Sequence, residues 1–341
     1  MNKTLVAFSK YLGHPIGGAE ASTIELLNDR SDQFQNVELV FSSFPNSSKL
    51  SPTNIPHPKN WNRIELSEVY SFSRMNYFEY FLNFKKVRDY FRKNYNHQDE
   101  LHTYGFLAIP AIEGFIGTSY YYVRSEPDLG FNPNYHVGSK RALKIAKNLI
   151  EAPFYILYRK HMERALKKTN VIANSEFMAK LCKERFDIKP RVMYPKINVE
   201  NIKQSMLKYR DKELPKGITF IGDDYNKGLP IVRELSQNMP NELFIIFSRK
   251  ITTPYQEKNV LWHPRTSDLG YVYSKSKMVI VPSFCREAYG RVAREAYLLG
   301  LPVLVSNNGG LPETVEYEQD KIINDYKNPD AWLSEVRRIL N

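Results

Sequence analysis

Short apolar runs alternate with helical patterns along nearly the whole chain of 341 residues. The clearest case is the segment 278–306, in which MVIVPS and PVLVS read as buried strands on either side of a helical pattern that ends at Gly300. A strand–helix–strand unit normally implies a parallel sheet that is covered by helices. The alternation therefore predicts an α/β chain.

The length favours two domains, because a single hydrophobic core seldom grows beyond about 300 residues. Strand-like runs occupy 4–9, 37–42, 100–104, 119–124, 170–175, 217–222, 242–248, 259–263, 278–283 and 302–306. The polar stretch 201–217, which ends in Pro215 and Gly217, has the composition of a linker. We expect two doubly wound domains over 1–200 and 201–327, with a helix over 328–341 that is free to pack back on the first domain.

The most informative stretch is CREAYGRVAREA, residues 285–296. It follows a predicted buried strand, so Glu287 lies in the loop at the C-terminal edge of the sheet. Gly290 and Arg291 lie where the next helix begins, and Glu295 lies about a turn inside it. Open α/β sheets bind ligands at this edge, and a helix N-terminus offers backbone N–H groups to an anion. For Glu295 alone, a solvated position on the helix is an equal alternative.

Glycine-rich loops follow three other predicted strands. The loop GHPIGG contains Gly17 and Gly18, the loop GDDYNKG contains Gly222 and Lys227, and a third loop reads NNGG. The spacing in the first loop does not fit the G-x-G-x-x-G fingerprint of dinucleotide-binding folds. Lys227 could neutralise a phosphate, and the alternatives are a tight turn for the glycines and a solvated lysine.

Charge is unevenly distributed along a chain whose formal net charge is +11. Segment 137–168 is rich in Lys and Arg, and segment 72–95 mixes basic with aromatic residues. This composition suits phosphates or an anionic membrane, although for each stretch taken separately a solvated face over a buried aromatic stripe is slightly the more common explanation. No apolar run reaches the ~20 residues that span a bilayer. The N-terminal run reads as a first strand, and the two cysteines fit reduced thiols in a cytoplasmic protein.

Several motifs, taken in order, resemble the retaining family 4 glycosyltransferases. They are GGAE (17–20), NSEF (174–177), F-x-G…K-G (220–228), the E-x7-E element within 282–296 and GLPVL…GGLPETV (300–315). The resemblance covers most of the chain and is most specific over 282–315. It implies a GT-B fold of two Rossmann-like domains that face a central cleft. It also implies a retaining, hexosyltransferase-like enzyme that uses a nucleotide-sugar as substrate, UDP-linked in our expectation, with no cofactor.

The resemblance assigns roles to particular positions. Glu287 would contact hydroxyls of the donor sugar, Glu295 the ribose, and Lys227 the departing diphosphate. The donor side as a whole would comprise Gly17, Gly18, Gly222, Lys227, Arg249, Glu287, Ala288, Tyr289, Gly290, Arg291, Val292 and Glu295. The backbone of 288–292 would hold the diphosphate.

Two departures from the family pattern change these assignments. Asp223 and Asp224 occupy the region where the family has an arginine, so the missing charge must come from Arg249, Arg291 or Arg124. The family's His-Asp pair is replaced by VRSEPD (123–128), which places Arg124 and Glu126 on the acceptor side. His102 could substitute for the histidine, and a core or surface histidine is the more common alternative. We therefore expect Glu287, Lys227 and Arg124 to be catalytic. The Glu126-Pro127-Asp128 sequence is a poor match to a metal-binding Asp-x-Asp pair, so we expect no metal.

The expected partners are a nucleotide-sugar donor, a growing surface glycan or polyprenyl-linked acceptor, and an anionic membrane. The expected location is the cytoplasm, with peripheral contact at the inner membrane face. Two alternatives keep the fold: a non-catalytic partner subunit of an active transferase, and a GT-B sugar-nucleotide epimerase. Nucleic-acid binding has charge but no motif in its favour.

Overall fold

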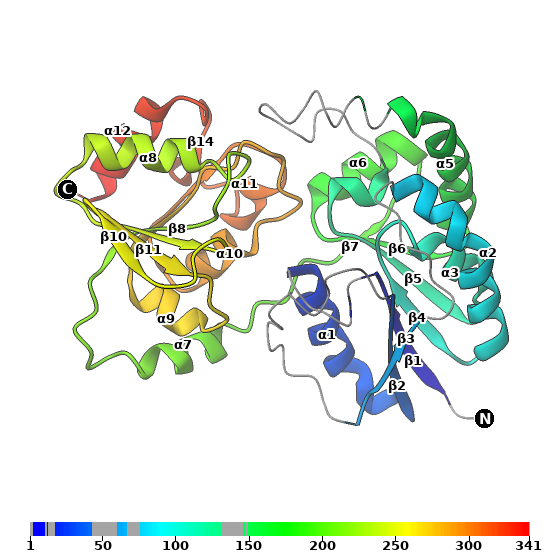
Figure 1. Cartoon of the computed structure of the whole chain (residues 1–341). Coiled ribbons are helices and arrows are strands. Elements are labelled where there is room, and N and C mark those ends of the chain that lie inside the picture. The colour runs from blue at the N-terminus through cyan, green and yellow to red at the C-terminus, as the bar shows by residue number, and fades with distance from the viewer. Residues whose placement is uncertain are drawn as a thin grey trace. The chain divides into compact units, whose positions relative to one another are not determined.

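The computed structural model describes residues 3–10, 12, 18–42, 60–66, 76–130, 146 and 149–340. These residues form two compact units, the first ending at Lys196 and the second beginning at Ile197 (Figure 1). Each unit is an α/β fold built on a parallel sheet. The predicted boundary after residue 200 lies inside the first helix of the second unit.

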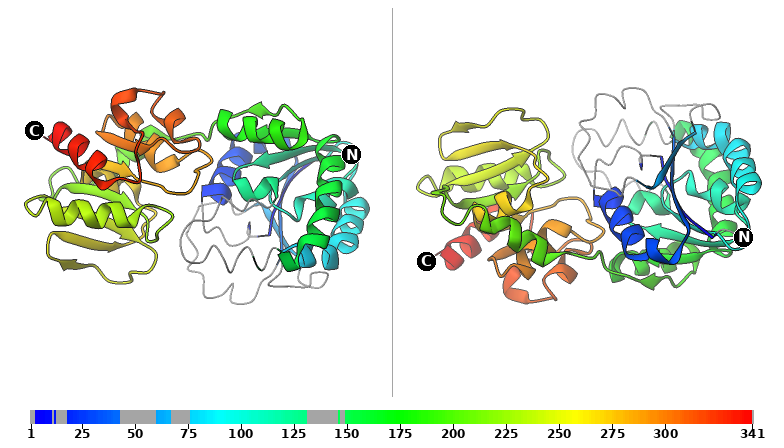
Figure 2. Two further views of the ribbon diagram at one scale, coloured as in Figure 1. Left: turned by 90° about the horizontal axis from the view of Figure 1, so that it is seen from above. Right: turned by 90° about the horizontal axis from the view of Figure 1, so that it is seen from below.

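The first unit contains a sheet in the order β3-β2-β1-β4-β5-β6-β7, with all of these strands parallel. The strands are β1 (Thr4–Phe8), β2 (Asn36–Phe41), β3 (Asn62–Glu65), β4 (Glu100–Thr103), β5 (Thr118–Val123), β6 (Asn170–Ala173) and β7 (Arg191–Val192). The helices are α1 (Gly18–Arg30), α2 (Asn76–Asn94), α3 (Ala108–Gly114), α5 (Ala152–Leu166) and α6 (Glu176–Phe186). Helices α2 and α5 lie side by side (Figures 1 and 2). The strand order reverses between β1 and β4.

The second unit repeats this winding in the order β10-β11-β9-β8-β12-β13-β14, in which only β10 is antiparallel. The strands are β8 (Gly217–Ile221), β9 (Phe244–Ser248), β10 (Tyr255–Glu257), β11 (Val260–Pro264), β12 (Ser276–Val281), β13 (Val303–Ser306) and β14 (Ile322–Ile323). The helices are α7 (Val199–Leu207), α8 (Leu229–Asn238), α9 (Leu269–Ser274), α10 (Arg291–Leu298), α11 (Leu311–Thr314) and α12 (Pro329–Leu340). Here the order reverses between β8 and β12, and this reversal positions the candidate site.

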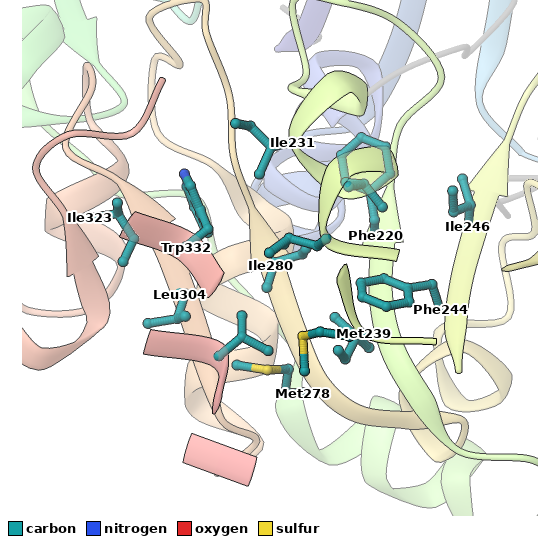
Figure 3. Close-up of a cluster of buried hydrophobic side chains, with 14 of the residues drawn as sticks. Phe220, Ile231, Met239, Phe244, Ile246, Met278, Ile280, Leu304, Ile323 and Trp332 are labelled. Carbon is teal, nitrogen blue, oxygen red and sulfur yellow. The ribbon is translucent and has the colours of Figure 1, made fainter. Parts of the chain in front are cut away.

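The two-residue period of the strands divides the core of the second unit into two layers. On β9, Phe244 and Ile246 pack toward α8 and α12, whereas Ile245 and Phe247 pack toward α7, α9 and α10. Figure 3 shows the first of these clusters, in which Trp332 from α12 lies among residues of the sheet. The prediction of an α/β chain with two Rossmann-like domains is confirmed.

The segment predicted to be a linker, 201–217, contains most of α7, whose Ile202 is buried in the core of the second unit and which packs on α9. Helix α12, within the predicted helix 328–341, packs on α8 of the second unit through its buried Trp332 and Val336. Its packing against the first unit stays a prediction.

Trp332 should be a main anchor of the second unit, since it is fully buried and its indole N–H donates to the carbonyl of Tyr326 at 2.9 Å. We predict that Trp332→Ala lowers the free energy of unfolding by about 3–5 kcal/mol, the usual cost of removing a large aromatic side chain from a core. Denaturant unfolding measures this change. Ser334→Ala, at an exposed position on the same helix, should change the free energy by less than about 0.5 kcal/mol. Equal effects of the two substitutions would contradict the placement of α12.

Candidate functional site

An ion pair joins the two loops that leave the second sheet at its reversal point. Lys227 lies in the loop after β8, and Glu287 lies in the loop after the neighbouring strand β12. The Lys227 ammonium donates to Glu287 Oε1 at 2.5 Å, and the Ser283 hydroxyl donates to the same oxygen at 2.8 Å. Parallel sheets bind ligands outside the carboxyl ends of their strands at such a reversal. The pair therefore lies where this fold places a ligand.

Electrostatics keep Glu287 ionised. Burial alone would raise the pKa of this carboxyl group, whose side chain is only 17% exposed. The charge and hydrogen bond of Lys227, together with the Ser283 hydroxyl, outweigh burial and lower the pKa of Glu287 below its ordinary value. The site thus presents a charged carboxylate and a charged ammonium, of which the lysine is the more exposed.

The backbone around Lys227 is set by a turn and a glycine. Asp224 Oδ1 accepts a hydrogen bond from the backbone N–H of Lys227 at 3.0 Å. Gly228 then adopts φ +86° at the start of α8. A Cβ atom on Gly228 would lie 1.8 Å from the carbonyl oxygen of Pro282, at the end of β12. Only glycine allows the two loops to approach this closely. This contact brings Lys227 to the β12 loop.

A second pair of glycines holds the backbone of Glu287. Gly309 pairs with Glu287 in an isolated parallel bridge, and the Gly310 N–H donates to the Glu287 carbonyl at 2.8 Å. A Cβ atom on Gly309, which has φ +66°, would lie 2.4 Å from that carbonyl oxygen. Asn308 adds side-chain hydrogen bonds to the carbonyls of Ser283 and Phe284. The NNGG loop singled out in the sequence therefore shapes the Glu287 loop.

Glu295 lies on α10 and is held by different partners. Its carboxylate is 6% exposed and accepts the Tyr273 hydroxyl at 2.6 Å and the Arg291 guanidinium at 3.5 Å. Helix α10 begins at Arg291, after Gly290 with φ +107°. The first N–H groups of a helix have no carbonyl partner within it, so the start of α10 combines backbone donors with the Arg291 charge.

The neighbouring Cys285 is not activated as a nucleophile. Its side chain is buried, and burial together with the nearby Glu287 charge raises the pKa of the thiol to about 12.

Two arginines extend this edge of the sheet on the other side of β8. Arg249 follows β9, and its backbone N–H donates to the Asp223 carboxylate at 3.0 Å. Arg265 follows β11, and its backbone N–H donates to the Ser248 carbonyl at 2.9 Å. Arg249 is among the predicted donor residues, whereas Arg265 is not. The available signal for Arg265 was its position two residues after the predicted strand 259–263. Gly222, also predicted, lies in the loop between β8 and Lys227, where a Cβ atom would contact the Phe220 ring at 2.6 Å.

The predicted residues of the first unit are more enclosed. Gly17 lies outside the described residues, and Gly18 is the first residue of α1. Arg124 lies over the rings of Tyr104 and Tyr122, at 5.0 and 4.7 Å, and donates to the Thr23 hydroxyl on α1. Arg124 thus joins the end of β5 to α1.

His102 and Glu126 are engaged within the protein. Both ring nitrogens of His102 have partners, since Nδ1 lies 2.7 Å from the Tyr122 hydroxyl and Nε2 lies 2.7 Å from Glu100 Oε1. Burial lowers the pKa of His102, although Glu100 opposes this shift. Glu126 is 1% exposed and pairs with Arg185 at 2.6 Å. Direct acceptor contact by either side chain would require these interactions to open.

Within the part of the chain that the structure describes, no group of His, Cys, Asp or Glu side chains is arranged to hold a metal ion. No described helix is long and apolar enough to cross a membrane.

The protein-family model described as "Glycosyl transferases group 1" matches residues 249–341, which include Glu287, Gly290 and Glu295. The match supports the resemblance at the level of this group, while membership of family 4 stays a prediction.

Curated relatives match over short segments. Spore coat protein SA of Bacillus subtilis (strain 168) is 32% identical over 78 residues, which are 23% of this chain and 21% of the relative. The D-inositol 3-phosphate glycosyltransferase of Corynebacterium glutamicum (strain R) is 37% identical over 75 residues, which are 22% of this chain and 18% of the relative. The matches thus span about a fifth of the length of these relatives.

Solved structures match over the whole chain. Sucrose-phosphate synthase from Thermosynechococcus elongatus has a TM-score of 0.72 at 17% identity, covering 100% of this chain and 90% of that one. Anabaena HepE in complex with UDP and glucose has a TM-score of 0.65 at 15% identity, with the same coverage. This likeness establishes the fold: both units are those of the GT-B fold.

The close approach at Gly228 gives a test of the site's architecture. We predict that Gly228→Ala lowers the free energy of unfolding by more than about 2 kcal/mol, because the new Cβ meets backbone and the loops must separate. Gly300→Ala is the matched control, since Gly300 also has a positive φ of +73° but no atom lies within 4 Å of a Cβ there. The control should lose only about 1–2 kcal/mol from backbone strain. Equal losses in denaturant unfolding would contradict the loop contact.

Proposed function

We propose that the chain is a retaining glycosyltransferase that moves a sugar from a UDP-linked donor to a glycan or lipid-linked acceptor. The observation that carries the proposal is the Lys227–Glu287 pair at the reversal point of the second sheet, beside the start of α10. The group 1 match over 249–341 supports it, as does the likeness to HepE, whose structure contains UDP and glucose.

Lys227 and α10 would act on the leaving group. Departure of a nucleoside diphosphate builds negative charge on its phosphates, and preorganised donors and cations lower the barrier most when they face that charge. The Lys227 ammonium is held in place by Glu287 before any donor arrives. The first N–H groups of α10 and the Arg291 guanidinium would receive the remaining phosphate oxygens. These groups supply the positive charge, so the proposed reaction requires no metal or cofactor.

The two glutamates would bind the donor's hydroxyl groups. Glu287 is ionised and accepts hydrogen bonds, which suits hydroxyls of the transferred sugar. Glu295, on α10 beside the groups that would receive the diphosphate, would accept ribose hydroxyls at its carboxylate. We do not assign Glu287 as a nucleophile, because the class it resembles favours attack on the face from which the diphosphate leaves.

The first unit would bind the acceptor. Arg124 would act through its contact with Thr23, which holds α1 and therefore the start of that helix at Gly18. His102 and Glu126 would support the acceptor side without touching the acceptor, since each is buried and paired.

An exposed apolar and basic surface on α2 and α5 would face an anionic membrane. Its exposed apolar members are Phe78, Leu82, Leu149, Ile150, Ile156 and Leu157. Phe78 contacts Phe154 across the two helices, and exposed Arg159 and Lys160 lie on α5. Apolar side chains beside basic ones suit the boundary between headgroups and acyl chains. A lipid-linked acceptor would be met at this surface, on the cytoplasmic side of the membrane.

Glu287→Gln tests the donor role. We predict that it lowers kcat/KM for sugar transfer at least about 100-fold, because the neutral amide no longer orients Lys227 or the sugar, while UDP binding is not weakened. Coupled assays of UDP release with product analysis measure turnover and distinguish transfer from epimerisation. Glu234→Gln, exposed on α8, should leave both values unchanged. A Glu287→Gln protein with unchanged turnover would rule out the assigned role, and a wild-type chain without turnover would favour the non-catalytic alternative.

Vesicle co-sedimentation tests the membrane surface. We predict binding to vesicles that contain phosphatidylglycerol, weakening as salt rises, and at least about 10-fold weaker binding after Leu149→Ser with Ile150→Ser. Leu207→Ser removes a similarly exposed leucine from α7 in the second unit and should not change binding. Absence of wild-type binding at low salt would remove the membrane from the proposal.

A further inference from the structure

Arg249 and Arg265 are brought together by the register of neighbouring strands. Strands β9 and β11 are parallel, and Ser248 pairs with Pro264 at their C-terminal ends. Arg249 and Arg265 are the next residues on the two strands, and the Arg265 N–H donates to the Ser248 carbonyl. Two arginines therefore leave the sheet side by side, at the same edge as Lys227 and Glu287.

These two guanidinium groups have no hydrogen-bonding or ion-pair partner among the residues that the structure describes. The other two cations of this edge are already matched, Lys227 with Glu287 and Arg291 with Glu295. Desolvation and the like charge of Arg249 lower the pKa of Arg265, whereas Asp223 and Glu295 oppose the shift. Two adjacent guanidinium groups repel each other, and a bound anion would remove that repulsion.

Asp223 holds Arg249 in this position. Its carboxylate accepts hydrogen bonds from the backbone N–H of Arg249 at 3.0 Å and from the Ser248 hydroxyl at 3.4 Å. The Lys250 ammonium donates to the Asp223 carbonyl at 2.7 Å. Asp223 occupies the position where the family pattern has an arginine, so it provides no positive charge. Its hydrogen bonds instead join the β8 loop to the β9 loop that carries Arg249.

We propose that Arg249 and Arg265 form a two-arginine site for the phosphate groups of a nucleoside diphosphate, and that Asp223 positions it. The site replaces the positive charge that the β8 loop lacks at residue 223. The inference rests on the proposed function, because the neighbouring Glu295 would hold the ribose of the same nucleotide. Planar guanidinium groups donate in pairs to phosphate oxygens, which a lysine cannot do.

Calorimetric titration of the full chain tests the site. The probes are UDP, GDP, ADP and CDP, and the nucleoside of whichever diphosphate binds most tightly. We expect Arg249→Met and Arg265→Met each to weaken diphosphate binding about 10-fold, and the double variant about 100-fold, since an arginine–phosphate hydrogen bond is charge-assisted. Binding of the nucleoside should change less than about 2-fold. Arg265→Lys should recover only part of the loss.

Arg233→Met is the matched control, because Arg233 is exposed on α8 of the same unit and lies at the opposite end of the sheet, near Glu242 and Asn259. It should bind every probe as the wild type does. If the double variant binds the diphosphate as tightly as the wild type, the inference is wrong while the proposed function stands. Equal losses for nucleoside and diphosphate would also overturn it, since the arginines would then serve the base or ribose. If the wild type binds no nucleoside diphosphate, both proposals fail.

Discussion

The ion pair between Lys227 and Glu287 is the interaction on which the candidate site depends. It spans two loops that leave neighbouring strands and then run to opposite sides of the sheet, so nothing in the local sequence of either loop would hold them together. Glycine at 228 permits the approach, and the Gly309–Gly310 turn holds the Glu287 backbone from the other side. A charged pair in a partly buried place is retained only when its geometry offsets the loss of hydration. Here the Ser283 hydroxyl completes the hydrogen bonding of the carboxylate.

The two units use buried charge differently. In the second unit, ionised side chains lie at the C-terminal edge of the sheet. Lys227 is the more exposed member of the Lys227–Glu287 pair, so an incoming anion can reach its ammonium group. In the first, charged and aromatic groups fill the space between α1 and the sheet, where Arg124 lies over two tyrosine rings and Tyr104 donates to Glu20 at 2.9 Å. Such a network fixes the orientation of α1 at a cost in desolvation that its internal hydrogen bonds offset. The buried charges of the first unit thus fix a helix, whereas those of the second include an exposed cation at the candidate site.

Much of the fold and part of the site follow from sequence pattern. The strands of both sheets are short apolar runs bounded by turn residues, and such local signals suffice to place Lys227, Glu287 and the NNGG loop at one edge of the second sheet. Long-range contacts decide the rest. The pairing of Glu126 with Arg185 joins positions far apart in the chain, and no local pattern distinguishes it from an exposed acceptor-side carboxylate. Helix α7 was read as linker because its burial rests mainly on Ile202. Arg265 was overlooked because its significance comes from the strand beside it.

A double-mutant cycle on Lys227→Met and Glu287→Gln tests the central claim most directly. The coupling free energy between the two side chains would be measured by denaturant unfolding, first without ligand and then with saturating nucleoside diphosphate. We predict a coupling of about 1–2 kcal/mol in the free chain, as expected for side chains in direct contact. We also predict that the coupling falls toward zero with bound diphosphate, because the ammonium then turns to the phosphate groups. Additive effects without ligand, or a coupling that the diphosphate leaves unchanged, would contradict the central claim.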